Sequence, residues 1–263
     1  GIFDHMERRN APLSQLYEER LQLLEVADRA GFWGYHKAEH HFIDLDAAPS
    51  SNLFLAAASQ RTSNIRFGPL VYLLPFYHPL RLIEEVCALD HLCGGRLEIG
   101  VGKGISPPEH RLWGLDPERA RSQFEEGFRI LREGLASERI DFVGEHYQFH
   151  DTPSPMVPHE GRVPAFWYPG NVAYAGRYRL NTVASGPVSS LAQASKDYRR
   201  AVDAADENWN HTVEHPTFAV KRHIYIGASD ADALARIERA YPVYHNNLAA
   251  LWKQYNVPFP NRD

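Results

Sequence analysis

Residues 65–74 read IRFGPLVYLL, an almost continuous apolar run. A strand without polar alternation is typical of a parallel sheet that is covered on both faces. The apolar residues that follow recur at the spacing of one helical stripe from Leu82 to Cys93, and two glycines end this stripe at residues 94–95. Residues 96–101 then return to an apolar strand pattern. The sequence therefore predicts a strand–helix–strand unit with parallel strands.

The same alternation covers the sequence on both sides of this unit. Strand patterns cover residues 1–5, 33–38, 165–168, 181–184 and 217–226, and helix patterns cover residues 12–31, 51–61, 116–135, 189–208, a short segment near Val172 and a segment after Ser229. About seven strands alternate with helices, and such repeats imply right-handed crossovers between parallel strands. This pattern favours a closed (β/α)8 TIM barrel, an α/β fold, as one domain over residues 1–263. We expect the C-terminus to be incomplete, because no eighth strand is in view.

Residues 140–162 break this rhythm. Residues 140–149 have the pattern of a small hairpin, and residues 153–164 are rich in proline, which is typical of a surface excursion. We expect this region to be an insertion in the barrel.

Composition excludes several classes of function. The 263 residues carry a formal net charge of −5, and no stripe of lysine and arginine follows a predicted helix, so nucleic-acid binding is not expected. No apolar run is long enough to span a membrane. Cys87 and Cys93 lie six residues apart in one predicted helix and face different sides, so we expect no disulfide between them. Free thiols without a CxxC motif indicate a reducing compartment, and we expect a cytoplasmic protein.

Residues 35–42, YHKAEHHF, concentrate three histidines, a lysine and a glutamate at the end of a predicted strand. A polar surface loop and the edge of an active site are the two interpretations. A shared metal ion is not expected, because neighbouring strand residues such as His40 and His41 point to opposite faces. The sequence also lacks a Gly-x-Ser-x-Gly nucleophile turn and a phosphate-binding P-loop.

Catalytic groups of a (β/α)8 barrel lie at the C-terminal ends of its strands. The residues at the predicted ends are Asp4, His5, Glu39, His40, His41, the segment 70–75, Gly102, Lys103, Gly104, Gly170, Asn171, Ser185 and Gly186. A lysine between glycines can approach a phosphate together with free backbone N–H groups. The apolar segment 70–75 would suit a flat ring.

The sequence resembles the bacterial luciferase-like, flavin-dependent monooxygenases. The resemblance depends on residues 38–42, AEHHF, after the second strand, on residues 74–81, LPFYHPLR, and on residues 94–104, GGRLEIGVGKG. These motifs occur in the order and at the spacing of that family. The resemblance implies a (β/α)8 barrel that uses reduced FMN and O2 on a small organic substrate, with substrate identity set by the inserted region.

The resemblance also implies roles for single residues. His40 matches the histidine near the flavin that assists its oxygen chemistry, whereas His41 is expected to be structural. Leu70 and Val71 match the pair whose peptide bond, often cis, supports the flavin ring. Lys103 stands where the family often has an arginine that contacts the phosphate, so the charge is kept but the two-pronged geometry is lost.

Four further positions complete the implied cofactor site. Gly170 and Asn171 match a loop that helps to hold the phosphate, and Ile105 and Ser185 match positions along the flavin edge. We expect reduced flavin to come from a separate reductase, because no nicotinamide-binding pattern is present, and we expect a homodimer from the family. Two alternatives stay open: hydride transfer with a deazaflavin on the same barrel, and a flavin-binding relative without turnover.

Overall fold

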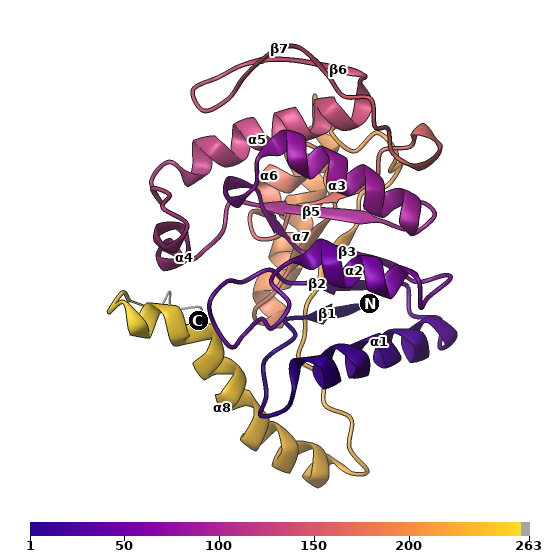
Figure 1. Cartoon of the computed structure of the whole chain (residues 1–263). Coiled ribbons are helices and arrows are strands. Elements are labelled where there is room, and N and C mark those ends of the chain that lie inside the picture. Colours follow the sequence, from indigo (N-terminus) through magenta and orange to yellow (C-terminus); the bar gives the residue numbers. More distant parts are fainter. Residues whose placement is uncertain (259–263) are drawn as a thin grey trace.

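Strands alternate with helices throughout the computed structural model, which describes residues 1–258 (Figure 1). The strands are β1 (Ile2–Asp4), β2 (Gly34–Lys37), β3 (Arg66–Pro69), β4 (Tyr72–Leu73), β5 (Glu98–Gly102), β6 (Arg139–Val143), β7 (Gln148–Pro153), β8 (Ala165–Trp167), β9 (Thr182–Ala184) and β10 (Phe218–Val220). The α-helices are α1 (Leu13–Arg29), α2 (Ser51–Ser59), α3 (Pro79–Leu92), α4 (Pro107–Leu112), α5 (Ala120–Ala136), α6 (Val172–Arg177), α7 (Val188–Asp203) and α8 (Asp230–Gln254). Short 3-10 helices cover Leu74–Phe76 and His159–Gly161.

The strands of the βα units are all parallel to their neighbours. One sheet has the order β1-β2-β3, a second has β4-β5-β8, and β9 pairs with β10. Single bridges from Phe67 to Leu97 and from Trp167 to Asn181 join these sheets in chain order. The parallel α/β fold is therefore confirmed. Within residues 1–258 the sheets do not close into a barrel, because no strand pairing joins β10 to β1.

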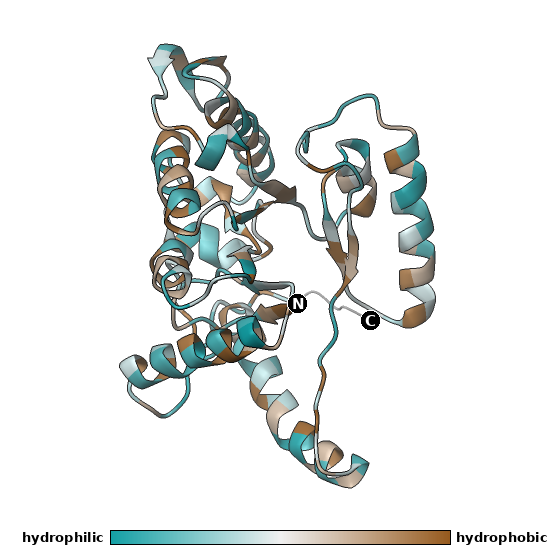
Figure 2. Ribbon diagram, turned by 90° about the vertical axis from the view of Figure 1, so that its right-hand side faces the viewer, coloured by the Kyte–Doolittle hydropathy of each residue, from teal (hydrophilic) through white to brown (hydrophobic). Residues whose placement is uncertain are grey.

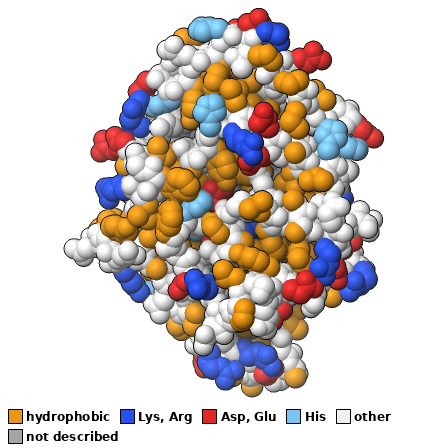
Figure 3. Space-filling view, viewed as in Figure 1, with side chains coloured by type: hydrophobic (Ala, Val, Ile, Leu, Met, Phe, Trp, Pro, Cys, Tyr) orange, Lys and Arg blue, Asp and Glu red, His pale blue; other side chains and the backbone are white. Residues whose placement is uncertain are grey.

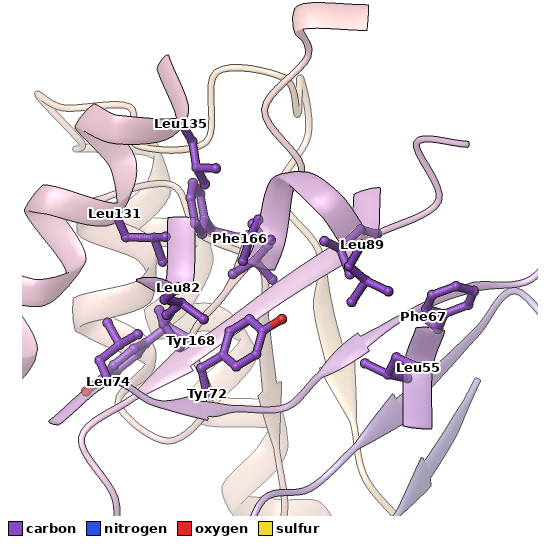
Figure 4. Packing of buried hydrophobic residues seen from close by; sticks show 14 of the residues in the cluster. Leu55, Phe67, Tyr72, Leu74, Leu82, Leu89, Leu131, Leu135, Phe166 and Tyr168 are labelled. Atoms are coloured by element: carbon purple, nitrogen blue, oxygen red, sulfur yellow. The ribbon is translucent and has the colours of Figure 1, made fainter. Parts of the chain in front are cut away.

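Helices cover the strands on either side, as Figure 2 shows. The predicted apolar stripes form the contact between them. Leu82 and Leu89 of α3 and Leu131 and Leu135 of α5 are buried and lie near Phe166 of β8 (Figure 4). Interdigitation of such side chains removes their apolar surface from water, at roughly 25 cal/mol per Å². This core holds the strand ends, and the residues that follow them, in fixed positions.

The sequence predicts one strand over the apolar run 65–74. The structure instead has two strands there, β3 and β4. The chain leaves the β1-β2-β3 sheet at Leu70 and Val71, whose peptide bond is cis, and joins the β4-β5-β8 sheet in β4. Leu70 donates its N–H to the carbonyl of Lys37, at 2.7 Å, and so stays attached to the end of β2. A Cβ atom at Gly68 would lie 1.7 Å from the carbonyl oxygen of Glu98, so only glycine permits β3 to approach β5 this closely.

Two predicted helix boundaries are wrong. The helix expected at Asp116 begins at Ala120, because the Asp116 side chain accepts the N–H of Glu118 at 2.9 Å and forms a local turn instead. The helix expected to reach residue 208 ends at Asp203. In addition, the sequence analysis did not predict helix α4.

The strand expected over residues 217–226 is also much shorter. Only Phe218–Val220 pairs, with β9, and the chain then continues without regular structure to α8. Ile224 and Ile226 are exposed in this segment. Residues 221–226 thus belong to the predicted strand but form no strand within the described part of the chain.

Residues 140–162 contain the predicted hairpin, in which β6 and β7 are antiparallel. The hairpin lies on the outer side of α5 (Figure 1). The Glu126 carboxylate of α5 accepts the backbone N–H groups of Glu145, His146 and Tyr147 at 2.7, 2.9 and 3.2 Å. The turn of the hairpin is therefore fixed to α5. Its role in setting substrate identity stays a prediction.

Three smaller expectations concern cysteines, membranes and the chain end. Cys87 and Cys93 are both buried and free, which confirms that no disulfide joins them. None of the described helices combines the length and the apolar character that crossing a bilayer requires. The predicted domain runs to residue 263, and residues 259–263 lie outside the described part.

Candidate active site at the C-terminal ends of the strands

The histidine segment follows β2 as a loop, because β2 ends at Lys37. The alternation of side chains along a strand, from which the sequence predicts opposite directions for His40 and His41, therefore does not apply to them. Their separation has another cause, since each imidazole faces a different carboxylate: His40 faces Glu109 and His41 faces Glu39.

A buried ion pair holds the start of this loop. The Lys37 ammonium lies 2.7 and 2.9 Å from the two carboxylate oxygens of Asp46, and both side chains are fully buried. Asp46 also accepts the backbone N–H groups of His40, at 3.1 Å, and Ala48, at 2.8 Å. The remaining Lys37 hydrogen bond goes to the carbonyl of Ala38, at 2.6 Å. The pair is thus saturated with hydrogen bonds and fixes the backbone of His40.

The His40 side chain is enclosed from two directions. Its Nδ1 atom lies 3.4 Å from Oε1 of Glu109, and its ring stacks on that of His5 with centroids 5.8 Å apart. The side chain is 12% exposed. The Nε2 atom has no hydrogen-bond partner among residues 1–258. The ring is therefore oriented by the protein through one nitrogen, and the other nitrogen is available to a bound molecule.

His41 belongs to a separate buried network. Its Nε2 atom lies 3.0 Å from Glu39, whose other oxygen accepts the Tyr77 hydroxyl at 2.8 Å. Burial is the largest influence on Glu39 and raises the pKa of its carboxyl group, whereas the hydrogen bonds from His41 and Tyr77 lower it. Both partners stabilise the carboxylate, which agrees with a structural role for His41.

Leu70 and Val71 lie over two glycines of β5. A Cβ atom at Gly100 would lie 2.9 Å from Leu70, and one at Gly102 would lie 2.7 Å from Cγ2 of Val71. The peptide bond between Leu70 and Val71 is cis, which confirms that expectation. Two glycines in β5 thus permit this apolar pair to stand beside the loop that follows β2.

Lys103 is exposed and follows β5 directly. Its ammonium contacts only the carbonyl of Gly104, at 3.4 Å, among the described residues. Its own carbonyl faces Nε2 of His110 at 2.9 Å, and the other nitrogen of His110 faces the carbonyl of Ser106 at 3.0 Å. The buried His110 ring therefore ties the backbone of the Lys103 loop to α4 and leaves the lysine head group in solvent.

The remaining predicted residues lie after β5, β8 and β9. Ile105 is 48% exposed, Gly170 has a φ angle of +100° with open space around its missing Cβ, and Ser185 is exposed. Asn171 caps α6, since its side chain accepts the N–H of Tyr174 at 2.9 Å. No hydrogen bond in the described part of the chain joins these residues to His40. They share its edge of the sheets because their strands are parallel.

Sequence reasoning missed the residues that orient His40. Glu109 lies on the unpredicted helix α4, and Asp46 lies beyond the histidine motif in a loop. One signal was available, because Ser106-Pro-Pro-Glu109 has the form of a helix N-terminus with proline at the first turn. Ser106 does cap α4, accepting the N–H of Glu109 at 3.3 Å.

Burial of His5 predicts a dependence of stability on pH. Burial and the charges around it, of which His40 contributes the most, lower the pKa of His5 from 6.5 to about 2. The unfolded chain therefore binds a proton as the pH falls through 6.5, whereas the folded protein does not. Between about pH 7 and about pH 5 this lowers the free energy of unfolding by roughly 2 kcal/mol. His5→Gln is expected to remove that part of the loss in urea unfolding.

The matched control is His215→Gln, because the His215 side chain is 90% exposed. This variant is expected to keep the pH dependence of the original protein. An equal loss of stability in His5→Gln and the original protein would show that His5 does not contribute.

The described residues contain no group of three or more His, Cys, Asp or Glu side chains placed to hold a metal ion. The edge instead combines an oriented imidazole, an apolar pair and a solvent-exposed ammonium. A proton-transfer group, a surface for a flat ring and an anion site are the chemical functions that these groups offer.

The sequence is similar to that of several known proteins. Residues 1–257 match the family model of luciferase-like monooxygenases. An uncharacterized protein, y4wF, of Sinorhizobium fredii is 35% identical over 99% of this chain and 76% of its own length. The 4-hydroxyprotoasukamycin monooxygenase of Streptomyces nodosus is 29% identical over 88% of this chain, which spans 65% of that relative. The oxygenase component of the flavin-dependent trigonelline monooxygenase of Acinetobacter baylyi is 26% identical over 96% and 71% of the two chains.

Solved structures share the fold. Monooxygenase RslO1 of Streptomyces bottropensis superposes with a TM-score of 0.84 at 24% identity, over 95% of this chain and 79% of that one. The oxygenating constituent of 3,6-diketocamphane monooxygenase of Pseudomonas putida, in complex with FMN, gives 0.82 at 20% identity, over 97% and 76%. A coenzyme F420-dependent tetrahydromethanopterin reductase of Methanopyrus kandleri gives 0.71 at 17%, over 92% and 71%. The chain therefore belongs to the luciferase-like monooxygenase family of oxidoreductases.

Proposed function

We propose that the protein is the oxygenase component of a flavin-dependent monooxygenase that uses reduced FMN and O2 on a small organic substrate. The observation that supports it most is the state of His40. Its backbone is held by Asp46 and its Nδ1 side by Glu109, while its Nε2 atom is left without a protein partner at the edge where cofactors bind in this fold. A side chain fixed in this way suits proton transfer.

The residues at this edge fit an FMN molecule. The apolar pair Leu70 and Val71 offers a surface for the flavin ring, and the ammonium of Lys103 offers a charge for the phosphate. Gly170 has open space at its Cβ position, and the exposed hydroxyl of Ser185 is a further donor. Reduced FMN would supply the electrons that activate O2. The protein would hold the cofactor through these groups, with Ile105 and Asn171 beside it.

His40 would then hold or move a proton at Nε2. The ring is aligned by its contact with Glu109 and by stacking on His5, so little reorientation is needed when a proton moves. Burial keeps His5 neutral, because its pKa is about 2, so His5 does not add a second charge beside His40. The rest of the loop keeps the imidazole at one place.

An aromatic group beside the histidine loop would form part of the substrate site. Trp113 contacts His41, Phe42 and Phe76 at ring distances of 5.2, 6.0 and 5.7 Å, and Phe42 and Trp113 are 66% and 45% exposed. In the view of Figure 3, hydrophobic side chains gather at the left of the molecule, on the side where Figure 1 places α4. Such a wall favours a substrate with an apolar or aromatic part.

Titration of the full-length protein with three cofactors tests the proposal. We expect oxidised and photoreduced FMN to bind, and we expect O2 to change the absorbance of the bound reduced form at a rate that differs from free flavin. Binding of a deazaflavin without any FMN affinity would replace the proposal with hydride transfer on the same barrel. Binding of reduced FMN with the same oxygen reactivity as free flavin would indicate a relative without turnover.

Lys103→Ala is expected to weaken FMN binding by about 10- to 100-fold, because a charge-assisted hydrogen bond to phosphate contributes roughly 1.5–3 kcal/mol. Riboflavin lacks the phosphate, so its affinity should not change. Arg111→Ala removes a nearby exposed charge on α4 and is the control for general electrostatics. Equal losses for FMN and riboflavin in Lys103→Ala would remove Lys103 from the phosphate site.

The proposal also covers the barrel domain, the source of reduced flavin and the oligomeric state. The parallel strands lie in chain order, which supports a single (β/α)8 barrel domain over residues 1–263. The Acinetobacter relative is an oxygenase component, which supports supply of reduced flavin by a separate reductase. A homodimer is expected from the family, and sedimentation equilibrium of the full-length protein would test it.

A further inference from the structure

Glu109 has a buried carboxylate whose hydrogen bonds go to another loop and not to its own helix, α4. It lies in the first turn of α4 and is 1% exposed. Its backbone N–H is already satisfied by the Ser106 hydroxyl, at 3.3 Å. Its carboxylate leaves α4 and reaches the loop after β2, where Oε1 accepts the N–H of His41 at 2.8 Å and lies 3.4 Å from Nδ1 of His40. The backbone contact fixes the oxygen in place, and the oxygen in turn faces the His40 ring.

The chemistry of the two groups decides which nitrogen carries the proton. An ionised carboxylate only accepts hydrogen bonds, so its contact with Nδ1 is favourable when Nδ1 carries the hydrogen. In a neutral imidazole, the hydrogen on Nδ1 leaves a lone pair on Nε2. The reverse tautomer would place the Nδ1 lone pair against the Glu109 oxygen.

The other groups around His40 do not compete with this arrangement. The His5 ring stacks on the face of His40 and is neutral, since burial lowers its pKa to about 2. The Asp46 carboxylate is directed to the backbone N–H of His40 and to the Lys37 ammonium. Among the described residues, Glu109 is therefore the group within hydrogen-bond distance of a ring nitrogen of His40.

We propose that Glu109 is a positioning residue that holds His40 in the Nδ1–H tautomer and so presents Nε2 to the bound cofactor and substrate. This inference rests on the proposed function, because it deepens the role of His40. Glu109 acts through His40 and contacts no reacting atom itself.

Glu109→Gln in the full-length protein tests the inference. Glutamine keeps the size and an acceptor for the N–H of His41, and it removes the charge that selects the tautomer. Histidine ring ¹⁵N NMR, with His40 assigned by comparison with His40→Ala, reports the tautomer without any cofactor. We expect Nδ1–H in the original protein and a shift of the neutral ring towards Nε2–H in Glu109→Gln. The reaction of O2 with bound reduced FMN should slow by about 10- to 100-fold.

The matched control is Glu118→Gln, which removes an exposed carboxylate near the start of α5 and should leave the His40 signal unchanged. An Nε2–H tautomer in the original protein, or an unchanged tautomer in Glu109→Gln, would overturn the inference. Unchanged flavin oxidation in His40→Ala would instead overturn the proposed role of His40. The NMR result and the kinetic result therefore separate the two failures.

Discussion

Replacement of His40 by alanine is expected to reduce turnover by about 10²- to 10⁴-fold, the usual contribution of a positioned proton-transfer group. The loss follows from the site geometry, because Nε2 of His40 is the ring nitrogen that has no hydrogen-bond partner among the described residues. Folding is expected to persist, since the backbone N–H of His40 still bonds to Asp46 and the N–H of His41 still bonds to Glu109. Stopped-flow oxidation of bound reduced FMN by O2 and circular dichroism measure the two effects.

The neighbouring histidine supplies a matched control. Glutamine at His41 can still donate a hydrogen bond from the position of Nε2 to Glu39, so His41→Gln should retain most of the turnover. His40→Asn keeps a donor near the position of Nδ1 and lacks the rest of the ring, and we expect it to behave like His40→Ala. Normal turnover in His40→Ala and His40→Asn would contradict the assignment of His40.

The sequence predicted elements well where one face of an element packs on the core. The stripe from Leu82 to Leu89 predicted α3, and Phe124 and Leu131 predicted most of α5, because the same side chains are buried in the structure. It failed where a distant residue decides the local conformation. The carbonyl of Lys37, which binds the N–H of Leu70 at the break between β3 and β4, is one such case.

The candidate site shows the same division. His40 could be proposed from the sequence because catalytic side chains follow strand ends, and the loop that holds it is encoded nearby in the chain. Its partner Glu109 lies 69 residues away on α4. The patterns in a single sequence do not show which of two such distant positions meet in space. The fold brings the end of β2 and the start of α4 together. Orientation of the imidazole is thus a property of the tertiary structure.

Residues 217–226 illustrate a different failure. Their apolar and β-branched residues indicate a strand of ten residues, and only Phe218–Val220 pairs. A strand pattern shows only that the side chains favour an extended chain. Pairing also needs a neighbouring strand that runs alongside the same residues. Within residues 1–258, β10 pairs only with β9, which offers Thr182–Ala184.

Asp46→Asn is expected to lower the free energy of unfolding by about 3–5 kcal/mol, the usual cost of leaving one member of a buried ion pair without its partner. Lys37 and Asp46 are both fully buried, so solvent does not screen the lysine charge that remains. The amide can still accept one N–H from the His40–Ala48 loop, so the loss reflects charge more than shape. Urea unfolding at about pH 7 measures it.

The double variant Lys37→Met/Asp46→Asn separates the charge from the fold of the loop. It removes both charges and keeps an acceptor for the backbone N–H of His40, so it should be more stable than Asp46→Asn alone. Glu125→Gln breaks an exposed pair with Arg121 on α5 and should change stability by less than about 1 kcal/mol. A cost for Asp46→Asn as small as that of Glu125→Gln would mean that the buried pair is not needed for stability. In that case the loop that carries His40 would be held mainly by the carboxylate of Glu109 and the packing of His5.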